Sequence, residues 1–521
     1  MQNATLRLSK YYKIGDTDDR LFGSFVEHMG STVYNGIFQP GHPSSDTDGT
    51  RTDVLELVKE LELSMIRYPG GNFVSGFAWE DSVGPIEDRP VRLDLAWKAI
   101  EPNTFGLNEF MHWIRKIPAE PIMSVNLGTR GIDAARNLVE YCNFPGGSHY
   151  SMLRQTHGVQ EPYGIKTWCL GNEMDGAWQV AAKTAEQYGL LSREAGKAMK
   201  WVDPDIELIA VGSSTPRMSE FPAWDKTVLM HTYEVVDYIS LHHYIDRQMP
   251  YNPISNQSLS DHLCKGEPVF IDTATYLARS QYVEQQIRDI IAVCDYVKSV
   301  KRSRKTMYLS FDEWNVIAPK KHIENNDESW STGEPIDCGA HSMEDLLVFA
   351  CMMMAIVRRA DRVKIACQSL LVNTGPLVVC SRDGKAWRNS IFYPFLHISK
   401  YGRGEVLNSI LDCPLYDSKE LTDTPVLDNL CVYNRKKGEL SLFLVNRSDS
   451  PVDMEIDVRD YSSVSFIEHQ AMFHSELDAV NTEKDPDNIV PVLMDEPCRL
   501  NEKEVCRLEA FSWNMIRYRV T

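Results

Sequence analysis

The stretch Ile206-Glu207-Leu208-Ile209-Ala210-Val211 is a nearly continuous apolar run. A strand with one face in water alternates apolar and polar residues, whereas this run predicts a parallel strand that is covered on both faces. From about residue 21 onward, similar short runs that end in polar residues alternate with longer segments of helical period. This alternation is typical of repeated βα units and places the chain in the α/β class.

Eight such units can be counted along the chain. Their expected strands lie near residues 21–27, 64–68, 121–126, 165–170, 206–211, 236–242, 306–313 and 363–370. The clearest helical segments between them are 52–61, 107–116, 184–201, 282–300 and 343–359. Eight units favour a (β/α)8 TIM barrel, and an open doubly wound sheet is the alternative.

The pattern changes after residues 387–401, which we expect to form the last barrel helix. Beyond them, short segments such as 439–445, 452–458 and 511–516 alternate in the two-residue period of antiparallel strands. We therefore predict a barrel over residues 19–401 and a jelly-roll-like antiparallel β-sandwich over residues 402–521. Residues 4–8 are also strand-like, so residues 1–18 are expected to join the sandwich.

Composition excludes several kinds of partner. The chain has 54 Lys and Arg against 73 Asp and Glu, a net charge of −19 that disfavours nucleic acid. It shows no signal-peptide pattern and no apolar run of membrane-spanning length, which predicts a cytoplasmic protein without membrane contact. The 12 Cys show no CxxC pair and no zinc-ligand spacing, so we expect free thiols, no metal and no cofactor.

Polar residues stand at the ends of the expected strands, where barrel enzymes assemble their active sites. They are Glu27-His28, the stretch from Arg67 to Asn72, Asn126, Asn172-Glu173, His242-His243-Tyr244 and Asp312-Glu313. Glycosidic cleavage needs one carboxylic acid to protonate the leaving oxygen and one carboxylate to attack or to activate water. Glu173 and Glu313 suit these roles, because the fourth and seventh strands stand across the barrel mouth from each other.

Each of these residues also has a purely structural interpretation. A Glu at a strand end can cap the next helix or pair with an Arg, and an Asn there can be a turn residue. Alternation along the seventh strand places Glu313 inside the barrel and Asp312 outside, as a structural ion-pair partner. The same rule places the side chains of His242 and His243 on opposite faces of the sixth strand. This argues against a shared metal site and favours a hydrogen-bonding role for His242.

Five motifs follow one another along the chain: residues 22–28 (FGSFVEH), 66–76 (IRYPGGNFVSG), 168–176 (WCLGNEMDG), 238–242 (YISLH) and 309–315 (LSFDEWN). In their order and over nearly the whole chain, they resemble glycoside hydrolase family 51, the α-L-arabinofuranosidases. The resemblance implies a retaining hydrolase in which Glu173 is the general acid/base and Glu313 is the nucleophile. It also implies an arabinofuranosyl oligosaccharide as substrate and a homo-oligomer, of which a hexamer is one form.

The resemblance assigns further residues to the sugar pocket. Glu27, Asn72 and Asn172 are similar to the family's ligands for sugar hydroxyls, and Trp97 matches an aromatic wall of the pocket but could equally be a core residue. Arg67 and Tyr244 are expected to hold Glu313 ionised, since a positive charge and a hydrogen-bond donor both favour a carboxylate.

Two positions depart from the family pattern. Ile317 stands where the family commonly has a Trp, and Leu370 stands where it has a Gln. Trp330, in the loop of residues 318–342, could supply a replacement wall, and Gln368 could replace the amide only if its strand carries a bulge. Both departures concern the choice of sugar.

Two other classes of function stay open at this point. The first is a different glycosidase on the same scaffold, such as a galactofuranosidase or an endo-acting β-glucanase. The second is a sugar-binding protein without catalytic activity, against which the presence of both Glu173 and Glu313 argues.

Overall fold

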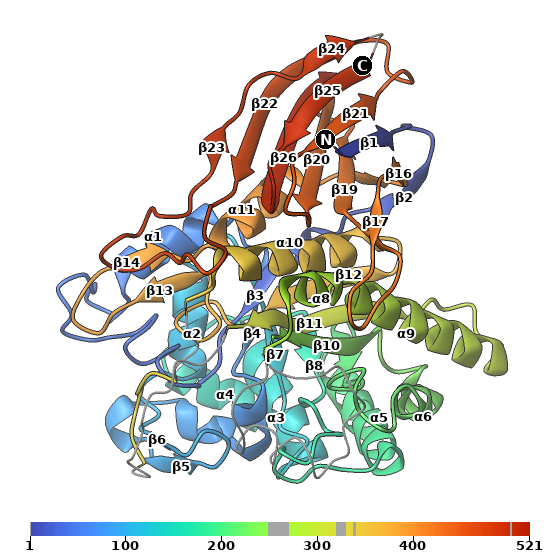
Figure 1. Ribbon diagram of the computed structural model, residues 1–521. Coiled ribbons are helices and arrows are strands. Elements are labelled where there is room, and N and C mark those ends of the chain that lie inside the picture. Colours follow the sequence, from blue (N-terminus) through green and yellow to red (C-terminus); the bar gives the residue numbers. More distant parts are fainter. Residues whose placement is uncertain (1, 248–269, 319–329, 337–339, 501–502) are drawn as a thin grey trace.

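The computed structural model describes residues 2–247, 270–318, 330–336, 340–500 and 503–521 (Figure 1). Within these ranges, eight parallel strands close into a barrel. They are β3 (Gly23–Phe25), β4 (Met65–Tyr68), β7 (Glu120–Ser124), β8 (Thr167–Cys169), β9 (Glu207–Ala210), β10 (Tyr238–Asp246), β11 (Tyr308–Ile317) and β12 (Val363–Gln368). Each overlaps a predicted strand, so the barrel is confirmed and the open sheet is wrong.

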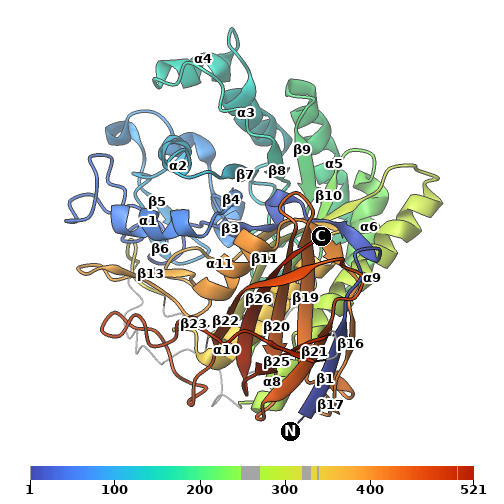
Figure 2. The same ribbon diagram turned by 90° about the horizontal axis from the view of Figure 1, so that it is seen from above.

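Helices surround the barrel (Figure 2). Those between residues 52 and 401 are α1 (Thr52–Glu60), α2 (Leu107–Ile114), α3 (Ile132–Asn143), α4 (His149–Thr156), α5 (Ala185–Val202), α6 (Ala223–Thr232), α8 (Thr273–Ala278), α9 (Gln281–Val300), α10 (Met343–Arg358) and α11 (Phe392–Tyr401). The last helix begins later than predicted, because Ala386–Arg388 instead forms β14, a strand paired with β13 (Val378–Cys380).

Helix α10 joins the two halves of the molecule. It contacts β11 and β12 on the barrel side and the sandwich strands β19 (Leu427–Asn434), β20 (Glu439–Asn446) and β26 (Ser512–Val520) on the other side (Figure 1). Residues from Met343 to Val357 are all buried. A helix that is apolar on every face belongs in such a position, between two layers.

Two sheets make up the sandwich within the described residues. The first has the order β16 (Ile410–Asp412), β1 (Gln2–Arg7), β21 (Val452–Asp457), β25 (Lys503–Leu508), β24 (Cys498–Leu500). The second has the order β2 (Lys13–Asp16), β15 (Glu405–Leu407), β19, β20, β26, β22 (Val464–Met472), β23 (Val492–Leu493). Pairing is mostly antiparallel, with β1 parallel to β21. The limits at residues 18 and 401 stay a prediction.

Both strands that carry the central polar residues are irregular at the barrel mouth. The register between β10 and β11 shifts between Ser240 and His242, and that between β11 and β12 shifts between Phe311 and Trp314. A bulge re-aims the side chains that follow it. Among the described helices, none is both long enough and apolar enough to cross a membrane.

Candidate active site

Glu173 and Glu313 meet at the mouth of the barrel. Glu313 lies on β11, and Glu173 lies four residues after the end of β8 with a φ of 43°. An oxygen of one carboxyl group lies within 4.8 Å of an oxygen of the other. Both side chains are buried. The predicted pair is therefore brought together, although it comes from strands far apart in the sequence.

Among the described residues, three side chains contact Glu313. Arg67 Nη1 donates to Oε1 at 2.6 Å, the Tyr244 hydroxyl donates to Oε2 at 2.9 Å, and His242 Nδ1 lies 3.4 Å from Oε2. Burial raises the pKa of Glu313, while the positive charges of His242 and Arg67 oppose that rise. The expected partners are in place, but they offset the cost of burial only in part.

Among the described residues, two side chains contact Glu173, one of which it shares with Glu313. His242 Nδ1 lies 3.0 Å from Oε1, and the indole Nε1 of Trp178 donates to Oε2 at 2.6 Å. Trp178 was not among the residues predicted for the site. It reaches Glu173 because the chain folds back at Gly176, where a Cβ atom would come within 2.4 Å of the indole. The WCLGNEMDG motif ends at this glycine, two residues before Trp178.

His242 links the two carboxyl groups. Burial disfavours its charge, but the surrounding carboxylates of Glu313, Asp312 and Glu173 raise its pKa to about 10. It is therefore an imidazolium near neutral pH. His243 points to the other face of β10, as predicted, where Nδ1 lies 2.8 Å from Gln286 Oε1.

The same three residues could also be read as a metal site. Glu173, His242 and Glu313 each offer one atom within 4.8 Å of the others. The Arg67 guanidinium and the proton on His242 already bring two positive charges to this cluster. A cation would be repelled by both, so the set fits protons and a neutral sugar better than a metal.

The prediction that Asp312 points out of the barrel is wrong. Asp312 is 1% exposed and faces the interior, with its carboxylate 3.6 Å from Arg67 Nε and 3.4 Å from His242 Nε2. It also lies 3.4 Å from the Sγ of Cys169, an interior residue of β8. The bulge in β11 explains the error, because simple alternation fails where two successive residues face the same side.

The residues predicted as sugar ligands are held by hydrogen bonds to their neighbours. Arg67 Nη2 donates to Asn172 Oδ1 at 2.7 Å, and Asn172 Nδ2 lies 3.3 Å from Asn72 Oδ1. Glu27 Oε1 accepts from Phe73 N and from Trp97 Nε1, both at 2.9 Å.

Glu27 is a carboxyl group that is protonated for much of the neutral range. Burial and the nearby charge of Glu313 raise its pKa to about 8. It lies against the backbone of Gly70 and Gly71, where added Cβ atoms would approach its side chain to 2.8 and 2.7 Å. Trp97 comes from the turn between β5 (Arg92–Asp94) and β6 (Ala99–Glu101), so its indole is tied to the site through Glu27.

The departures from the family pattern have structural consequences. Leu370 is 2% exposed and belongs to the apolar interior of the barrel, together with Phe25, Met65 and Ile365. Gln368 does not replace the missing amide, because its Oε1 accepts from Ser24 Oγ at 3.0 Å and its Nε2 donates to the carbonyl of Gly375.

Ser369, between these two residues, reaches the site instead. Its Oγ lies 2.7 Å from the Tyr244 hydroxyl, which also contacts Glu313. Sequence alternation alone would not have found it, since it stands just beyond the end of β12.

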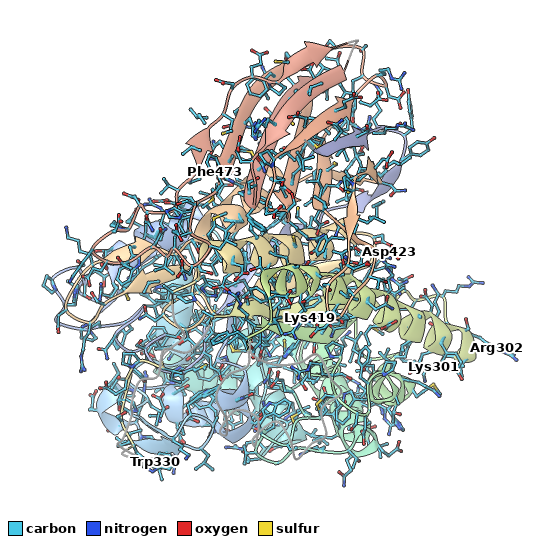
Figure 3. All side chains as sticks on the ribbon, in the orientation of Figure 1. Lys301, Arg302, Trp330, Lys419, Asp423 and Phe473 are labelled. Carbon is cyan, nitrogen blue, oxygen red and sulfur yellow. The ribbon has the colours of Figure 1, made fainter. Side chains whose placement is uncertain are left out.

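Trp330 lies near the turn that carries Trp97. The next residue, Ser331, accepts from Ile100 N at 3.0 Å, so this segment runs beside β6 (Figures 1 and 3). Trp330 is 37% exposed. Residues 319–329 and 337–339 of the loop predicted around it lie outside the described residues, and Ile317 at the end of β11 is 42% exposed.

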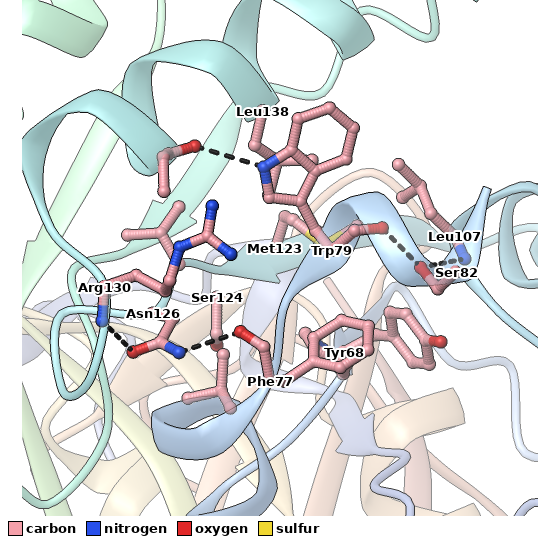
Figure 4. Close-up of a pocket in the computed structure, with 14 residues that line it drawn as sticks. Tyr68, Phe77, Trp79, Ser82, Leu107, Met123, Ser124, Asn126, Arg130 and Leu138 are labelled. Atoms are coloured by element: carbon pink, nitrogen blue, oxygen red, sulfur yellow. Dashed lines mark hydrogen bonds between the residues drawn. The ribbon is translucent and has the colours of Figure 1, made fainter. Parts of the chain in front are cut away.

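Asn126 has a structural role. Its amide donates to the carbonyl of Phe77 at 2.8 Å, and its Oδ1 accepts from Arg130 N at 3.3 Å (Figure 4). The same Oδ1 also accepts from Gly128 N at 2.9 Å. It borders a cavity of about 20 Å³ between β7 and α3. Such a volume holds about one water molecule and no sugar. The polar cluster around Glu173 and Glu313 is therefore the better candidate site.

Two facing carboxyl groups at the C-terminal mouth of a (β/α)8 barrel define a class, the barrel glycoside hydrolases. Comparison with known proteins agrees. Residues 57–256 match the α-L-arabinofuranosidase 1 domain, and residues 312–512 match the α-L-arabinofuranosidase C-terminal domain.

Individual proteins resemble the chain over its whole length. It is 46% identical to the intracellular exo-α-(1→5)-L-arabinofuranosidase 1 of Bacillus subtilis and 46% identical to the intracellular exo-α-(1→5)-L-arabinofuranosidase of Acetivibrio thermocellus, over 99% of both chains in each case. A solved family 51 α-L-arabinofuranosidase from Bifidobacterium longum is 33% identical, with a TM-score of 0.91 over 99% of this chain and 100% of that one. The chain belongs to glycoside hydrolase family 51, the α-L-arabinofuranosidases.

Proposed function

We propose that the chain removes terminal non-reducing α-L-arabinofuranosyl residues from oligosaccharides with retention of anomeric configuration. The observation that carries this proposal is the approach of Glu173 and Glu313, whose nearest ligand oxygens lie within 4.8 Å. Retaining enzymes hold their two carboxyl groups about 5 to 5.5 Å apart, whereas inverting enzymes leave about 6.5 to 9.5 Å for a water molecule. The short separation favours direct attack by a carboxylate.

In the first step, a Glu313 oxygen attacks the anomeric carbon and the bond to the leaving oxygen breaks. Glu173 gives its proton to that oxygen, so the leaving group departs as an alcohol. In the second step, water attacks the anomeric carbon, Glu173 takes its proton, and the bond to Glu313 breaks. Arabinose and the free carboxylate result.

The roles differ because the surroundings of the two groups differ. Glu313 is contacted by a guanidinium, a phenol and an imidazolium, which suit an anionic nucleophile. Glu173 has no contact with Arg67 among the described ion pairs; Trp178 donates to one of its oxygens, and it shares His242 with Glu313. The two groups therefore differ in the guanidinium and the phenol, which among the described residues contact Glu313 and not Glu173.

The remaining site residues are proposed as ligands of the furanose ring. Glu27, Asn72 and Asn172 carry carboxyl and amide groups that offer both donors and acceptors to sugar hydroxyls. A Glu27 that keeps its proton can itself donate to a hydroxyl oxygen. Trp97 would border the ring, held in place by its bond to Glu27.

We also propose that the protein acts inside the cell on short arabino-oligosaccharides and assembles as a homo-oligomer, with a hexamer as the expected form. The relatives named intracellular exo-α-(1→5)-arabinofuranosidases support the first part. The second part rests on the family resemblance alone. Light scattering would show a hexamer as a mass of about six times 59.4 kDa, and a monomer mass would contradict it.

The experiment that tests the activity is a screen of aryl α-L-arabinofuranosides, galactofuranosides and glucopyranosides with the purified protein. Proton NMR of the first product anomer follows on any substrate that is cleaved. We expect cleavage of the arabinofuranoside and first appearance of the α anomer. First appearance of the β anomer would contradict retention. Cleavage of only another glycoside would contradict the sugar assignment.

A further inference from the structure

Asp312 is a buried carboxylate that the proposed mechanism does not use. It lies on the barrel side of the catalytic pair, with Oδ2 3.6 Å from Arg67 Nε and Oδ1 3.4 Å from His242 Nε2. Both separations exceed that of an ordinary hydrogen bond, and Arg67 Nε and Asp312 Oδ1 have no hydrogen-bond partner among the described residues. Asp312 therefore acts on these cations through its charge.

The charges of the cluster balance before reaction. Arg67 and His242 each carry one positive charge, and both are nearly inaccessible to solvent. Glu313 supplies one negative charge as the nucleophile, and Glu173 is neutral while it holds its proton. Without Asp312 the cluster would keep one uncompensated positive charge, which is costly where water cannot solvate it.

The balance also holds in the covalent intermediate. Once Glu313 forms an ester it is neutral, and Glu173 has given its proton to the leaving oxygen and is negative. The two positive charges of Arg67 and His242 are then balanced by the negative charges of Glu173 and Asp312, so the net charge of the cluster is again zero. The two catalytic carboxyl groups exchange one negative charge while Asp312 supplies the second negative charge throughout.

We propose that Asp312 is a positioning residue that keeps the buried catalytic cluster neutral in both halves of the reaction. This inference rests on the proposed double displacement. Asp312 does not touch the sugar; it acts by holding His242 protonated and by orienting the Arg67 guanidinium toward Glu313. Burial works against its ionisation, yet Arg67 and His242 hold the pKa of Asp312 below its ordinary value.

The pKa of His242 depends on the charge of Asp312 and can therefore report its loss. Three carboxyl groups face the His242 ring, those of Asp312 and Glu313 on β11 and that of Glu173 after β8. From α9, Gln286 donates to its carbonyl at 3.1 Å. Removal of the Asp312 charge leaves fewer anions to stabilise the imidazolium, so His242 loses its proton at lower pH.

The test is Asp312→Asn, which keeps the shape and removes the charge. We expect kcat to fall about tenfold or more with KM changed less, and the alkaline limb of the kcat/KM profile to move about 1 pH unit downward. In parallel, NMR of 13C-labelled histidine should show His242, assigned by loss of its signal in His242→Gln, titrating at lower pH than in the wild type.

Asp225→Asn is the matched control. Asp225 is equally buried and accepts from Ser213 N at 2.9 Å, but it lies on α6 outside the cluster, so its loss should leave both titrations unchanged. Asp312→Ser provides a second charge-free variant if Asp312→Asn does not fold. An unshifted His242 titration in a folded variant would overturn this inference. Because that measurement needs no substrate, it is separate from a failure of the proposed activity.

Discussion

Tyr244→Phe removes the hydroxyl that donates a hydrogen bond to the proposed nucleophile. The Tyr244 hydroxyl donates to Glu313 Oε2 at 2.9 Å and lies 2.7 Å from Ser369 Oγ. Phe keeps the ring and its packing, so the change removes these two contacts and little else. A hydrogen bond to a charged group contributes about 1.5 to 3 kcal/mol, and about 1.4 kcal/mol corresponds to a factor of ten in rate.

From these magnitudes we expect kcat/KM on an aryl arabinofuranoside to fall by about 10- to 150-fold. Loss of a donor to the charged form raises the pKa of Glu313 further, so the acid limb of the pH profile should move to higher pH. Steady-state kinetics between about pH 4 and pH 9 would measure both effects.

Tyr276→Phe is the control for this experiment. Tyr276 is also fully buried and donates to a carboxylate, Asp345 Oδ1, at 2.7 Å, but it lies on α8 outside the site. It should lose stability and keep the wild-type pH profile. If Tyr244→Phe had wild-type kcat/KM and an unmoved acid limb, the hydroxyl would not serve the nucleophile and the reasoning would be refuted.

Three further changes test other contacts. Trp178→Phe removes the indole donor to Glu173, and we expect the largest loss of kcat on substrates with poor leaving groups, measured over a series of aryl leaving groups. Glu27→Gln should raise the melting temperature relative to the wild type, and this difference should grow as pH rises toward 8. The pKa of Glu27 is about 8 in the folded protein and lower in the unfolded protein, so the wild type loses stability as pH rises between these two values, whereas Gln does not ionise. A difference in melting temperature that stays constant with pH in calorimetry would argue against this prediction. Leu370→Gln should lower the free energy of unfolding by about 1 to 3 kcal/mol without raising activity, because it places an amide in the apolar barrel interior; a gain in kcat/KM would show that the amide reaches the sugar.

The barrel could be predicted from the sequence because its evidence is local. Each strand is an apolar run that ends in polar residues, and eight repetitions of the unit leave few other folds. The pairing of Glu173 with Glu313 followed from the strand count, since strands four and seven face each other. Residues such as Arg67 and Tyr244 were found because they lie on or just after the second and sixth expected strands.

The wrong prediction for Asp312 and the missed site residues depend on three-dimensional geometry that a local sequence pattern does not predict. Asp312 was placed outside the barrel because alternation assumes a regular strand, and β11 is bulged at that point. Trp178 was missed because its contact arises from a fold-back of the loop at Gly176. Ser369 was missed since it lies beyond the end of its strand, where side-chain direction is no longer periodic.

The central claim is that Glu313 becomes covalently bound to the sugar while Glu173 handles the proton. A 2-deoxy-2-fluoro arabinofuranosyl donor with a good leaving group slows the second step, and mass spectrometry of a peptic digest then locates the label. We predict one labelled peptide, containing Glu313, and no label in Glu313→Gln. A label on Glu173, or rapid turnover by Glu313→Gln, would contradict the account.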